Sequence, residues 1–175
     1  MKKTILFTVL ILMVVSLGFS QEALNCKKVK YQDVAKFMAD YYTAYNLYAQ
    51  DAPTMDQMDL YWAPEFLSIQ YLPLPQPMVM DRTTWKNFLI FAHLNVTETL
   101  TVEELSIDLE TLTATGRLSI NFNDRSNGQL VLHVYCSAFY NLKADKKGHL
   151  KMTALKLYFA DPYAVMALSG PPPGM

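Results

Sequence analysis

Hydrophobic positions in the first half of the chain recur at helical spacing. Over about 29–49, apolar and aromatic residues lie three or four positions apart, which places them on one face of a helix. They are Val34, Phe37, Met38, Tyr41, Tyr45 and Tyr48. A short second helix is predicted from Thr54, a capping residue, to near Pro64. Asp81 is expected to cap a third helix over about 82–94.

The second half of the chain alternates between apolar and polar residues, as half-buried strands do. Such strands are predicted over 66–72, 105–109, 113–122, 130–142 and 155–159. The pair Asn127-Gly128 is a strong hairpin signal. Prolines at every second position of 73–77 exclude a helix or an interior strand, so that stretch is predicted to be a loop.

The period of two also predicts which strand residues face the interior. These inner positions are Leu67, Ile69, Tyr71, Leu105, Ile107, Leu109, Leu118, Ile120, Phe122, Leu132, Val134, Cys136, Ala138, Leu155 and Leu157. None is Asp, Glu or His, so an apolar interior without a base is expected. Glu104, Asp108 and His133 fall on the opposite face unless a bulge reverses the alternation.

The opposite face of the predicted sheet is unusually aromatic. Tyr135, Phe139 and Tyr158 lie on it beside His133. Val131, Met152 and Lys156 are predicted to share the same face. An apolar surface of this size points to association with another molecule. His133 is then expected to be an interface residue.

The first twenty residues have the composition of a signal peptide. Lys2 and Lys3 precede an apolar run, and Gly18-Phe19-Ser20 places small residues before a cleavage site after Ser20. The run is shorter than the roughly twenty residues that span a membrane, so export followed by cleavage is expected, with no stable membrane insertion afterwards. A periplasmic or extracellular location follows. A lipoprotein modified at Cys26 is disfavoured, because Ala23-Leu24-Asn25 matches that signal poorly.

Charge and cysteine content exclude several functions. Removing Lys2 and Lys3 leaves 13 Lys and Arg against 16 Asp and Glu, a formal charge of −3. This charge balance gives no excess of positive charge of the kind that binds nucleic acid. The three His have no metal-ligand spacing, so neither a metal nor another cofactor is expected. Cys26 and Cys136 either form a disulfide in an oxidising compartment or stay unpaired, with Cys136 buried in a strand.

The order of elements resembles the NTF2-like superfamily, which includes SnoaL-like polyketide cyclases and ketosteroid isomerases. The stretch Asp59-Leu60-Tyr61-Trp62-Ala63-Pro64-Glu65-Phe66 looks like the family's short helix leading into a strand. A capped helix with Trp85 then precedes the sheet. The resemblance implies an α+β cone with three N-terminal helices packed on a curved, mainly antiparallel sheet. The domain is predicted over 21–168, between the signal peptide at 1–20 and a disordered tail at 169–175.

The resemblance also implies a conical, largely apolar pocket and a homodimer formed through the outer sheet face. The expected pocket residues are Tyr41, Tyr45, Trp62, Tyr71, Trp85, Phe88, Leu118, Ile120, Leu132 and Val134. Enzymes of the family place a carboxylate or His in this pocket, opposed by a Tyr. The weak candidates here are Asp161 and His133, with Tyr41 or Tyr45 as the electrophile.

Three functions therefore stand at this point. The leading expectation is an exported domain that binds a small apolar or aromatic ligand, or a protein partner, without catalysis. The first alternative is an isomerase, cyclase or dehydratase that acts by proton transfer in the pocket. The second alternative is an assembly module that acts through the outer sheet face.

Overall fold

The computed structural model describes residues 29–169. The predicted signal peptide, Cys26 and most of the predicted tail lie outside the described residues. The described chain divides between two compact units. The described residues of the first unit are Val29 and Ala144–His149. In the segment Ala144–His149, the Asp145 side chain accepts hydrogen bonds from the backbone N–H groups of Lys147 and His149, both at 2.8 Å. All further description concerns the second unit, 30–143 and 150–169.

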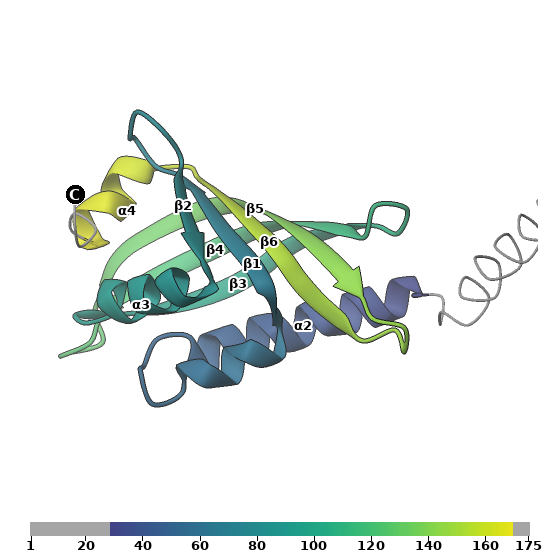
Figure 1. The fold of residues 1–175 in the computed structure, drawn as a ribbon. Helices are drawn as coiled ribbons and strands as arrows, with labels where there is room; N and C mark the ends of the chain where they lie inside the picture. Colours follow the sequence, from purple (N-terminus) through teal and green to yellow (C-terminus); the bar gives the residue numbers. More distant parts are fainter. Residues whose placement is uncertain (1–28, 170–175) are drawn as a thin grey trace, which may run out of the picture. The chain divides into compact units, whose positions relative to one another are not determined.

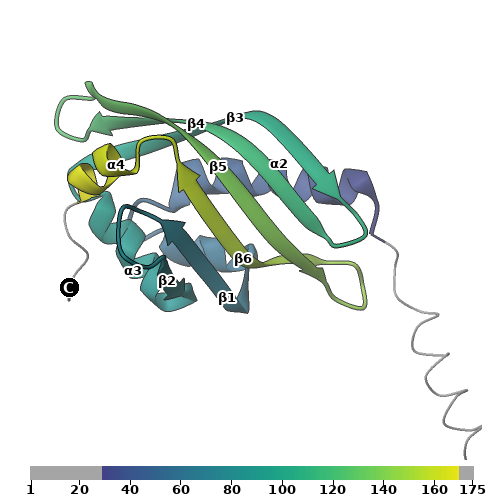
Figure 2. The same cartoon turned by 90° about the horizontal axis from the view of Figure 1, so that it is seen from above.

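Six strands form one curved sheet in the order β2-β1-β6-β5-β4-β3 (Figures 1 and 2). The strands are β1 (Trp62–Tyr71), β2 (Met78–Asp81), β3 (Val96–Asp108), β4 (Thr113–Asp124), β5 (Leu130–Ala144) and β6 (Leu150–Phe159). The β1–β2, β3–β4 and β4–β5 pairs are antiparallel, while β1 and β6 are parallel. The predicted α+β class with a mainly antiparallel sheet is confirmed.

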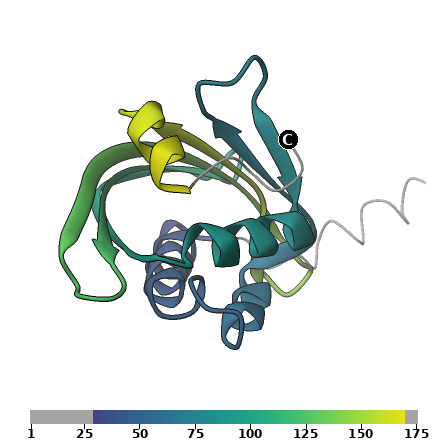
Figure 3. The ribbon, with the colours of Figure 1, turned by 90° about the vertical axis from the view of Figure 1, so that its left-hand side faces the viewer.

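Within residues 29–169, four helical segments accompany the sheet: α2 (Tyr31–Tyr48), the 3-10 helix η1 (Met55–Leu60), α3 (Arg82–Ala92) and α4 (Pro162–Ser169). Figure 3 shows α2 and α3 inside the concave side of the sheet. Three N-terminal helices are not confirmed, because one α-helix and η1 precede β1 and α3 follows β2. Asp81 caps α3 as predicted, accepting a hydrogen bond from the Thr84 backbone at 2.8 Å. No helix within residues 29–169 has the length and apolar character to cross a membrane.

The predicted inner face of the first strand is wrong. Ser68 and Gln70 of β1 are buried, with 0% and 3% of their surface exposed, whereas Leu67 is 41% exposed. The buried residue that sets the alternation is Phe66, so positions 66, 68 and 70 point inward. Tyr71 lies on the other side of the strand and stacks on Tyr158, with ring centroids 4.1 Å apart. Two polar side chains therefore enter the interior on β1.

β3 also differs from the prediction, because it begins at Val96 rather than at Leu105. Val96, Glu98 and Leu100 are buried, and the pairing with β4 shifts between Val102 and Glu104. One extra residue in a strand reverses the faces beyond it. If the alternation predicted at Leu105 is continued back to Val96, it gives the wrong face for the first half of β3. Glu98 lies on the inner face there.

One end of the interior is filled by large side chains. Fully buried residues there include Met38, Tyr41, Met58, Trp62, Tyr140 and Met152. Met152 was predicted on the outer face, and this is wrong because the buried face of β6 changes between Met152 and Leu155. The Tyr140 ring lies edge-on to Tyr41 and to Tyr42, at centroid distances of 6.0 and 5.9 Å. A Cβ atom at Gly116 would lie 2.6 Å from the Tyr42 hydroxyl, so glycine is needed for this packing.

Candidate functional site

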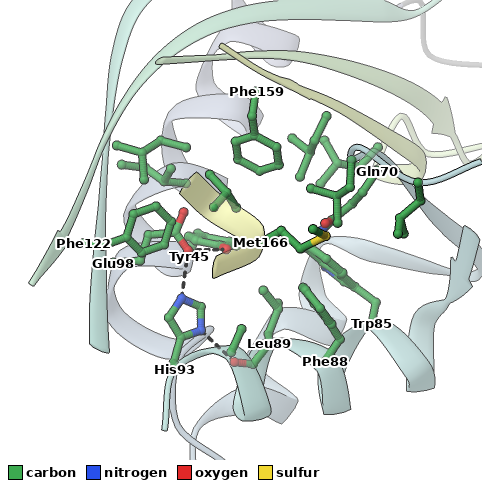
Figure 4. Close-up of a pocket in the computed structure, with 18 of the residues that line it drawn as sticks. Tyr45, Gln70, Trp85, Phe88, Leu89, His93, Glu98, Phe122, Phe159 and Met166 are labelled. Atoms are coloured by element: carbon green, nitrogen blue, oxygen red, sulfur yellow. Dashed lines mark hydrogen bonds and ion pairs between the residues drawn. The ribbon is translucent and has the colours of Figure 1, made fainter. Parts of the chain in front are cut away.

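The other end of the interior holds a cavity of about 60 Å³ between the sheet, α2, α3 and α4 (Figure 4). Most of its wall is apolar. The lining side chains are Tyr41, Tyr45, Gln70, Leu72, Leu74, Trp85, Phe88, Leu89, Ala92, His93, Glu98, Leu100, Ile120, Phe122, Leu155, Leu157, Phe159, Val165 and Met166. This composition, with a few polar groups among apolar ones, is typical of a small-molecule site.

A carboxylate, an imidazole and a phenol meet at one wall of the cavity. The Nε2 atom of His93 lies 2.8 Å from Oε2 of Glu98, and the Tyr45 hydroxyl donates to the same oxygen at 3.1 Å. The side chains are almost fully enclosed, with 2% of His93 and 8% of Glu98 exposed. No described residue hydrogen-bonds to the second carboxylate oxygen, Oε1 of Glu98. That oxygen is free to meet a ligand.

The contacts of His93 fix the number of protons in this group. Its Nδ1 atom lies 2.7 Å from the Leu89 carbonyl oxygen, which only accepts, so Nδ1 carries a hydrogen. The short Nε2–Oε2 contact then requires one further proton, held either by the imidazole or by the carboxyl group. His93 and Glu98 therefore share a proton, and the pair is neutral as a whole in either arrangement. Such a pair is equipped to take up or release a proton.

Asn46 in the last turn of α2 and Gln50 just beyond the helix hold the Glu98 segment of β3 in place. Gln50 accepts from the Glu98 backbone N–H at 2.8 Å and donates to the Glu98 carbonyl oxygen. Asn46 makes the same pair of bonds with Leu100, at 2.8 and 2.9 Å. The two amides are four residues apart in the chain, and they meet two residues of β3 that lie on the same side of the strand. The backbone of Glu98 is thus held by the turn that follows α2.

Burial keeps Tyr45 protonated. Removal from water, reinforced by the neighbouring Glu98, holds the pKa of the Tyr45 hydroxyl well above its ordinary value. The neutral phenol is therefore the form present at physiological pH, and it acts as a hydrogen-bond donor to the carboxylate. Burial likewise raises the pKa of Tyr41, which lies beside it.

The opposite part of the wall carries polar groups without partners. The carboxamide of Gln70 lines the cavity, yet no described residue hydrogen-bonds to it. Trp85 also lines the cavity, and its buried indole N–H has no partner among the described residues. An unpaired buried donor or acceptor costs about 1–3 kcal/mol, so such groups are rare unless a ligand or water satisfies them.

The predicted pocket residues divide into two groups. Tyr41, Tyr45, Trp85, Phe88 and Ile120 line the cavity. The other five do not: Trp62, Leu118 and Val134 are buried in the core, Leu132 is half-buried, and Tyr71 stacks on the outer face. The difference has a simple cause, because the cavity occupies one end of the interior while the predicted set covers its whole length.

The two weak catalytic candidates lie away from the cavity. Asp161 is exposed and caps α4, accepting from the Ala164 backbone at 2.9 Å. His133 is exposed on the outer face, 2.9 Å from the Ser119 hydroxyl and edge-on to Tyr135. The expectation of a cavity without a base is also wrong, since it contains Glu98 and His93.

The predicted interface residues do lie on the outer face of the sheet. Tyr135, Phe139 and Tyr158 are each about 40% exposed, and the rings of Phe139 and Tyr158 meet at 5.5 Å. Burial of this face by a second copy stays a prediction. So does the disulfide, because Cys26 lies outside the described residues. Cys136 is buried on β5, and burial raises the pKa of its thiol to about 12.

Sequence reasoning missed Glu98 and His93 for different reasons. Glu98 stands in the alternating series Val96, Glu98, Leu100, Val102, which is itself a strand signal. Taking this series by itself, with its apolar members facing inward, would have placed Glu98 inside, whereas extending the alternation of Leu105 would not. His93 has no such signal, because its role depends on the turn that brings the end of α3 against β3.

Among the described residues, no group of three His, Cys, Asp or Glu could hold a metal ion.

No family model and no curated protein sequence matches this chain. Several solved structures are similar to it. A candidate SnoaL-like polyketide cyclase from Jannaschia sp. CCS1 is 12% identical, with a TM-score of 0.56 over 81% of this chain and 94% of that one. The BvnE pinacolase from Penicillium brevicompactum is 11% identical, with a TM-score of 0.61 over 78% and 89%.

An NTF2-like protein of unknown function from Shewanella baltica OS155 is also similar, with 12% identity and a TM-score of 0.50 over 75% of this chain and 97% of that one. These likenesses confirm the NTF2-like fold that the sequence suggested. At such identities they show the fold alone, so function must be argued from the cavity.

Proposed function

We propose that this protein is an enzyme that moves a proton on a small, uncharged and largely apolar molecule bound in the cavity. One observation carries the proposal. The Glu98 carboxylate is held through Oε2 by His93 and Tyr45, while Oε1 is unpaired in an apolar cavity. A positioned carboxylate with a free oxygen and a coupled imidazole is the arrangement that general acid–base catalysis requires.

The shared proton gives this pair a way to stabilise charge. Before reaction, Glu98 and His93 are together neutral. When Oε1 of Glu98 accepts a proton from the substrate, the pair becomes positive while the substrate becomes negative. The two opposite charges then lie close together in a cavity that excludes most water, where their attraction is strong. Returning the proton to another atom of the substrate would complete an isomerisation, cyclisation or elimination.

The cavity wall restricts the charge of the substrate. None of the described lining residues is Lys or Arg, so a phosphate or carboxylate would find no fixed cation there. Burying such a group without a partner costs several kcal/mol. The aromatic and aliphatic wall fits a neutral skeleton. The fold that the chain shares with proteins named as a polyketide cyclase and a pinacolase is consistent with catalysis in this cavity.

The proposal replaces the expectation of binding alone, which rested on an interior without a base. Binding without catalysis is the second candidate, and the unpaired Gln70 carboxamide favours it, because a ligand is needed to satisfy that group in either case. The two candidates differ in whether a bound molecule exchanges its protons.

Proton exchange in heavy water tests the choice. We expect the protein to accelerate the exchange of α-hydrogens for deuterium in a graded series of neutral ketones, from acetone to cyclohexanone, as followed by proton NMR. Glu98→Gln should abolish the acceleration. Glu104→Gln is the matched control, because Glu104 is exposed on the same strand. Ligand binding without exchange above the buffer rate for any ketone would favour the binding function.

Export and self-association remain part of the proposal. The basic and apolar stretches before Ser20 support cleavage and export, which N-terminal sequencing of the protein secreted from its host would test. The exposed aromatic residues of the outer face support a homodimer. Sedimentation of the mature protein would test this, with Tyr135→Ser and Phe139→Ser expected to give a monomer.

A further inference from the structure

Arg125 is not among the residues that line the cavity, yet it contacts both segments that hold Glu98. Its Nε atom donates to the carbonyl oxygen of His93 at 3.1 Å, and its Nη2 atom donates to the carbonyl oxygen of Gln50 at 3.4 Å. Gln50 binds the backbone of Glu98, and His93 contacts its carboxylate. One guanidinium group therefore joins the two residues on which the geometry of the Glu98 carboxylate depends.

This guanidinium group contacts the C-terminal ends of two helices. Gln50 follows the last turn of α2, and α3 ends at His93. The last carbonyl groups of a helix have no intrahelical partners and carry partial negative charge. A guanidinium group offers five N–H donors in a fixed plane, so one side chain satisfies carbonyl groups of both helices. Arg125 therefore fixes the end of α3 relative to the end of α2.

The position of Arg125 is itself fixed by the hairpin between β4 and β5. Its backbone N–H donates to the carbonyl oxygen of Asn95 at 2.9 Å, and its Nη1 atom pairs with Asp51 at 2.9 Å. The preceding residue, Asp124, accepts hydrogen bonds from the backbone and the hydroxyl of Ser126 at 2.7 and 2.6 Å. The side chain thus reaches the two helix ends from a hairpin that is held by its own hydrogen bonds.

The contact between His93 and Glu98 depends on a short turn. Residues 93–95 join α3 to β3, so the imidazole reaches the strand through this turn. Arg125 donates to two of its carbonyl oxygens, those of His93 and Asn95. A misplacement of about 1 Å in a reacting group slows a reaction by roughly a hundredfold. Whatever holds this turn therefore controls the pair that shares the proton.

We propose that Arg125 is a positioning residue of the acid–base site. Its guanidinium group holds the His93 imidazole at the distance from the Glu98 carboxylate at which the two share a proton. Because Arg125 does not line the cavity, it acts through His93 and Gln50 and does not contact a bound ligand. Its effect on the reaction rate rests on the proposed proton transfer, whereas its effect on the shared proton does not.

Proton NMR of the shared proton tests this role directly. A proton in a short hydrogen bond between an imidazole and a carboxylate resonates far downfield of the backbone amide protons. Glu98→Gln assigns the signal by abolishing it. We expect Arg125→Gln to move the signal upfield or to broaden it beyond detection, because the imidazole is then free to leave the carboxylate.

Arg82→Gln is the matched control and should leave the signal in place. The side chain of Arg82 is 32% exposed, against 34% for Arg125. It pairs with Asp59 at the opposite end of α3, 3.6 Å away, so its loss removes a similar ion pair from the same helix. A wild-type protein without the downfield signal, or a signal that both substitutions alter equally, overturns the proposal.

Deuterium exchange in the ketones that test the proposed function gives a second measure. We expect Arg125→Gln to lower the maximal exchange rate about tenfold to a hundredfold. The ketone concentration at half-maximal rate should stay unchanged, because the cavity wall is intact. Arg125→Lys keeps the charge, but one Nζ atom does not reproduce the planar set of donors, so most of the rate should still be lost. A full rate and an unaltered signal in Arg125→Lys would contradict the geometric role.

The two readouts separate this inference from the proposed function and from a purely structural role. An altered signal in Arg125→Gln, in a protein whose wild type shows no exchange, supports the positioning role and contradicts the enzyme. Wild-type exchange that Arg125→Gln leaves unchanged supports the enzyme and contradicts the positioning role. A lower unfolding temperature with an unaltered signal means a structural role and also overturns the proposal. If circular dichroism shows that Arg125→Gln is unfolded, Arg125→Lys is measured in its place by the same criteria.

Discussion

The two ends of the interior share α2 but differ in packing and in whether their polar groups face an open space. At the packed end, Tyr41 and Tyr42 of α2 meet the ring of Tyr140 edge-on, and large side chains fill the space. At the cavity end, Tyr45 of the same helix donates to Glu98, and both the carboxylate and Gln70 keep groups without protein partners.

The difference separates stability from chemistry within one core. Apolar burial and aromatic contacts stabilise the packed end, where a void would cost free energy. The cavity end gives up some of that packing. Its unpaired carboxylate oxygen and carboxamide line an open space, whereas the unpaired Tyr42 hydroxyl and Trp62 indole N–H of the packed end do not. Proteins carry such costs where function requires them. Substitutions at the two ends should therefore affect different quantities, and four experiments test this.

Alkaline pH should have the largest effect, because it acts on buried tyrosines at both ends of the interior. Burial raises the pKa of Tyr42 to about 12 and also raises those of Tyr41, Tyr140 and, at the cavity end, Tyr45. Because the folded pKa values are raised, the stabilisation is fully present below pH 10 and is lost as pH rises towards the folded values. At pH 11 Tyr42 alone should have lost about 1.4 kcal/mol of stabilisation, and the other buried tyrosines add to this loss.

Urea unfolding at pH 8, 10 and 11, together with tyrosinate absorbance, measures this loss. The buried tyrosines should ionise only as the protein unfolds. Ionisation of all tyrosines in a single step near pH 10, with unchanged stability, would contradict the burial argument.

Glu98→Gln should have the next largest effect, on the rate alone. Loss of the base should slow proton exchange about a hundredfold to a thousandfold, or about 2.7–4 kcal/mol. The free energy of unfolding should change little, because the substituted amide keeps the size of the side chain. Steady-state exchange rates and urea unfolding measure the two quantities. A loss of stability as large as the loss of rate would mean that Glu98 belongs to the packing and not to the chemistry.

Gly116→Ala should affect the packed end more weakly. The added Cβ atom would lie 2.6 Å from the Tyr42 hydroxyl, which must move. Overpacking of this kind costs about 1–3 kcal/mol. Thermal unfolding measures it, and adding Tyr42→Phe should recover part of the loss by removing the oxygen. Exchange rates in the cavity should stay near those of the wild type. No recovery in the double variant would mean that the strain lies elsewhere.

Tyr45→Phe should give the smallest effect of the four. It removes one of two donors to Oε2 of Glu98 and leaves His93 in place. The exchange rate should fall about fivefold to tenfold, or about 1–1.4 kcal/mol. Tyr41→Phe is the control, because the hydroxyl of Tyr41 has no hydrogen bond to Glu98 within the described structure. Equal effects of the two substitutions would argue against a specific role for Tyr45.

Much of the fold could be predicted from the sequence, and the site could not. Helical spacing of tyrosines identified α2, and Asp81 marked the start of α3. The resemblance to the NTF2-like fold was correct. The site depends on which face each strand presents, and that face reverses with a shift of one residue. β1 follows Phe66 rather than Leu67, and the irregularity after Val102 reverses β3.

The errors share a physical origin. A hydrophobic alternation identifies a strand but not its inner face when both faces carry large apolar residues. Here the outer face carries Leu67 and Tyr71, so the alternation in β1 favoured the wrong face, and the polar Ser68 and Gln70 were placed outside. Only the pairing with β2 and β6 decides between the faces, and that information is not local.

The bonds from Asn46 and Gln50 to β3 have a consequence for solubility. β3 is the last strand of the sheet, so its outer backbone groups are those that a second chain could pair with. The two amides occupy them at Glu98 and Leu100. Losing these amides would leave backbone N–H and C=O groups of the edge strand unpaired. It would also loosen the position of the Glu98 carboxylate. Variants at these two positions should therefore aggregate, and selection for a soluble protein would also preserve the geometry of the site.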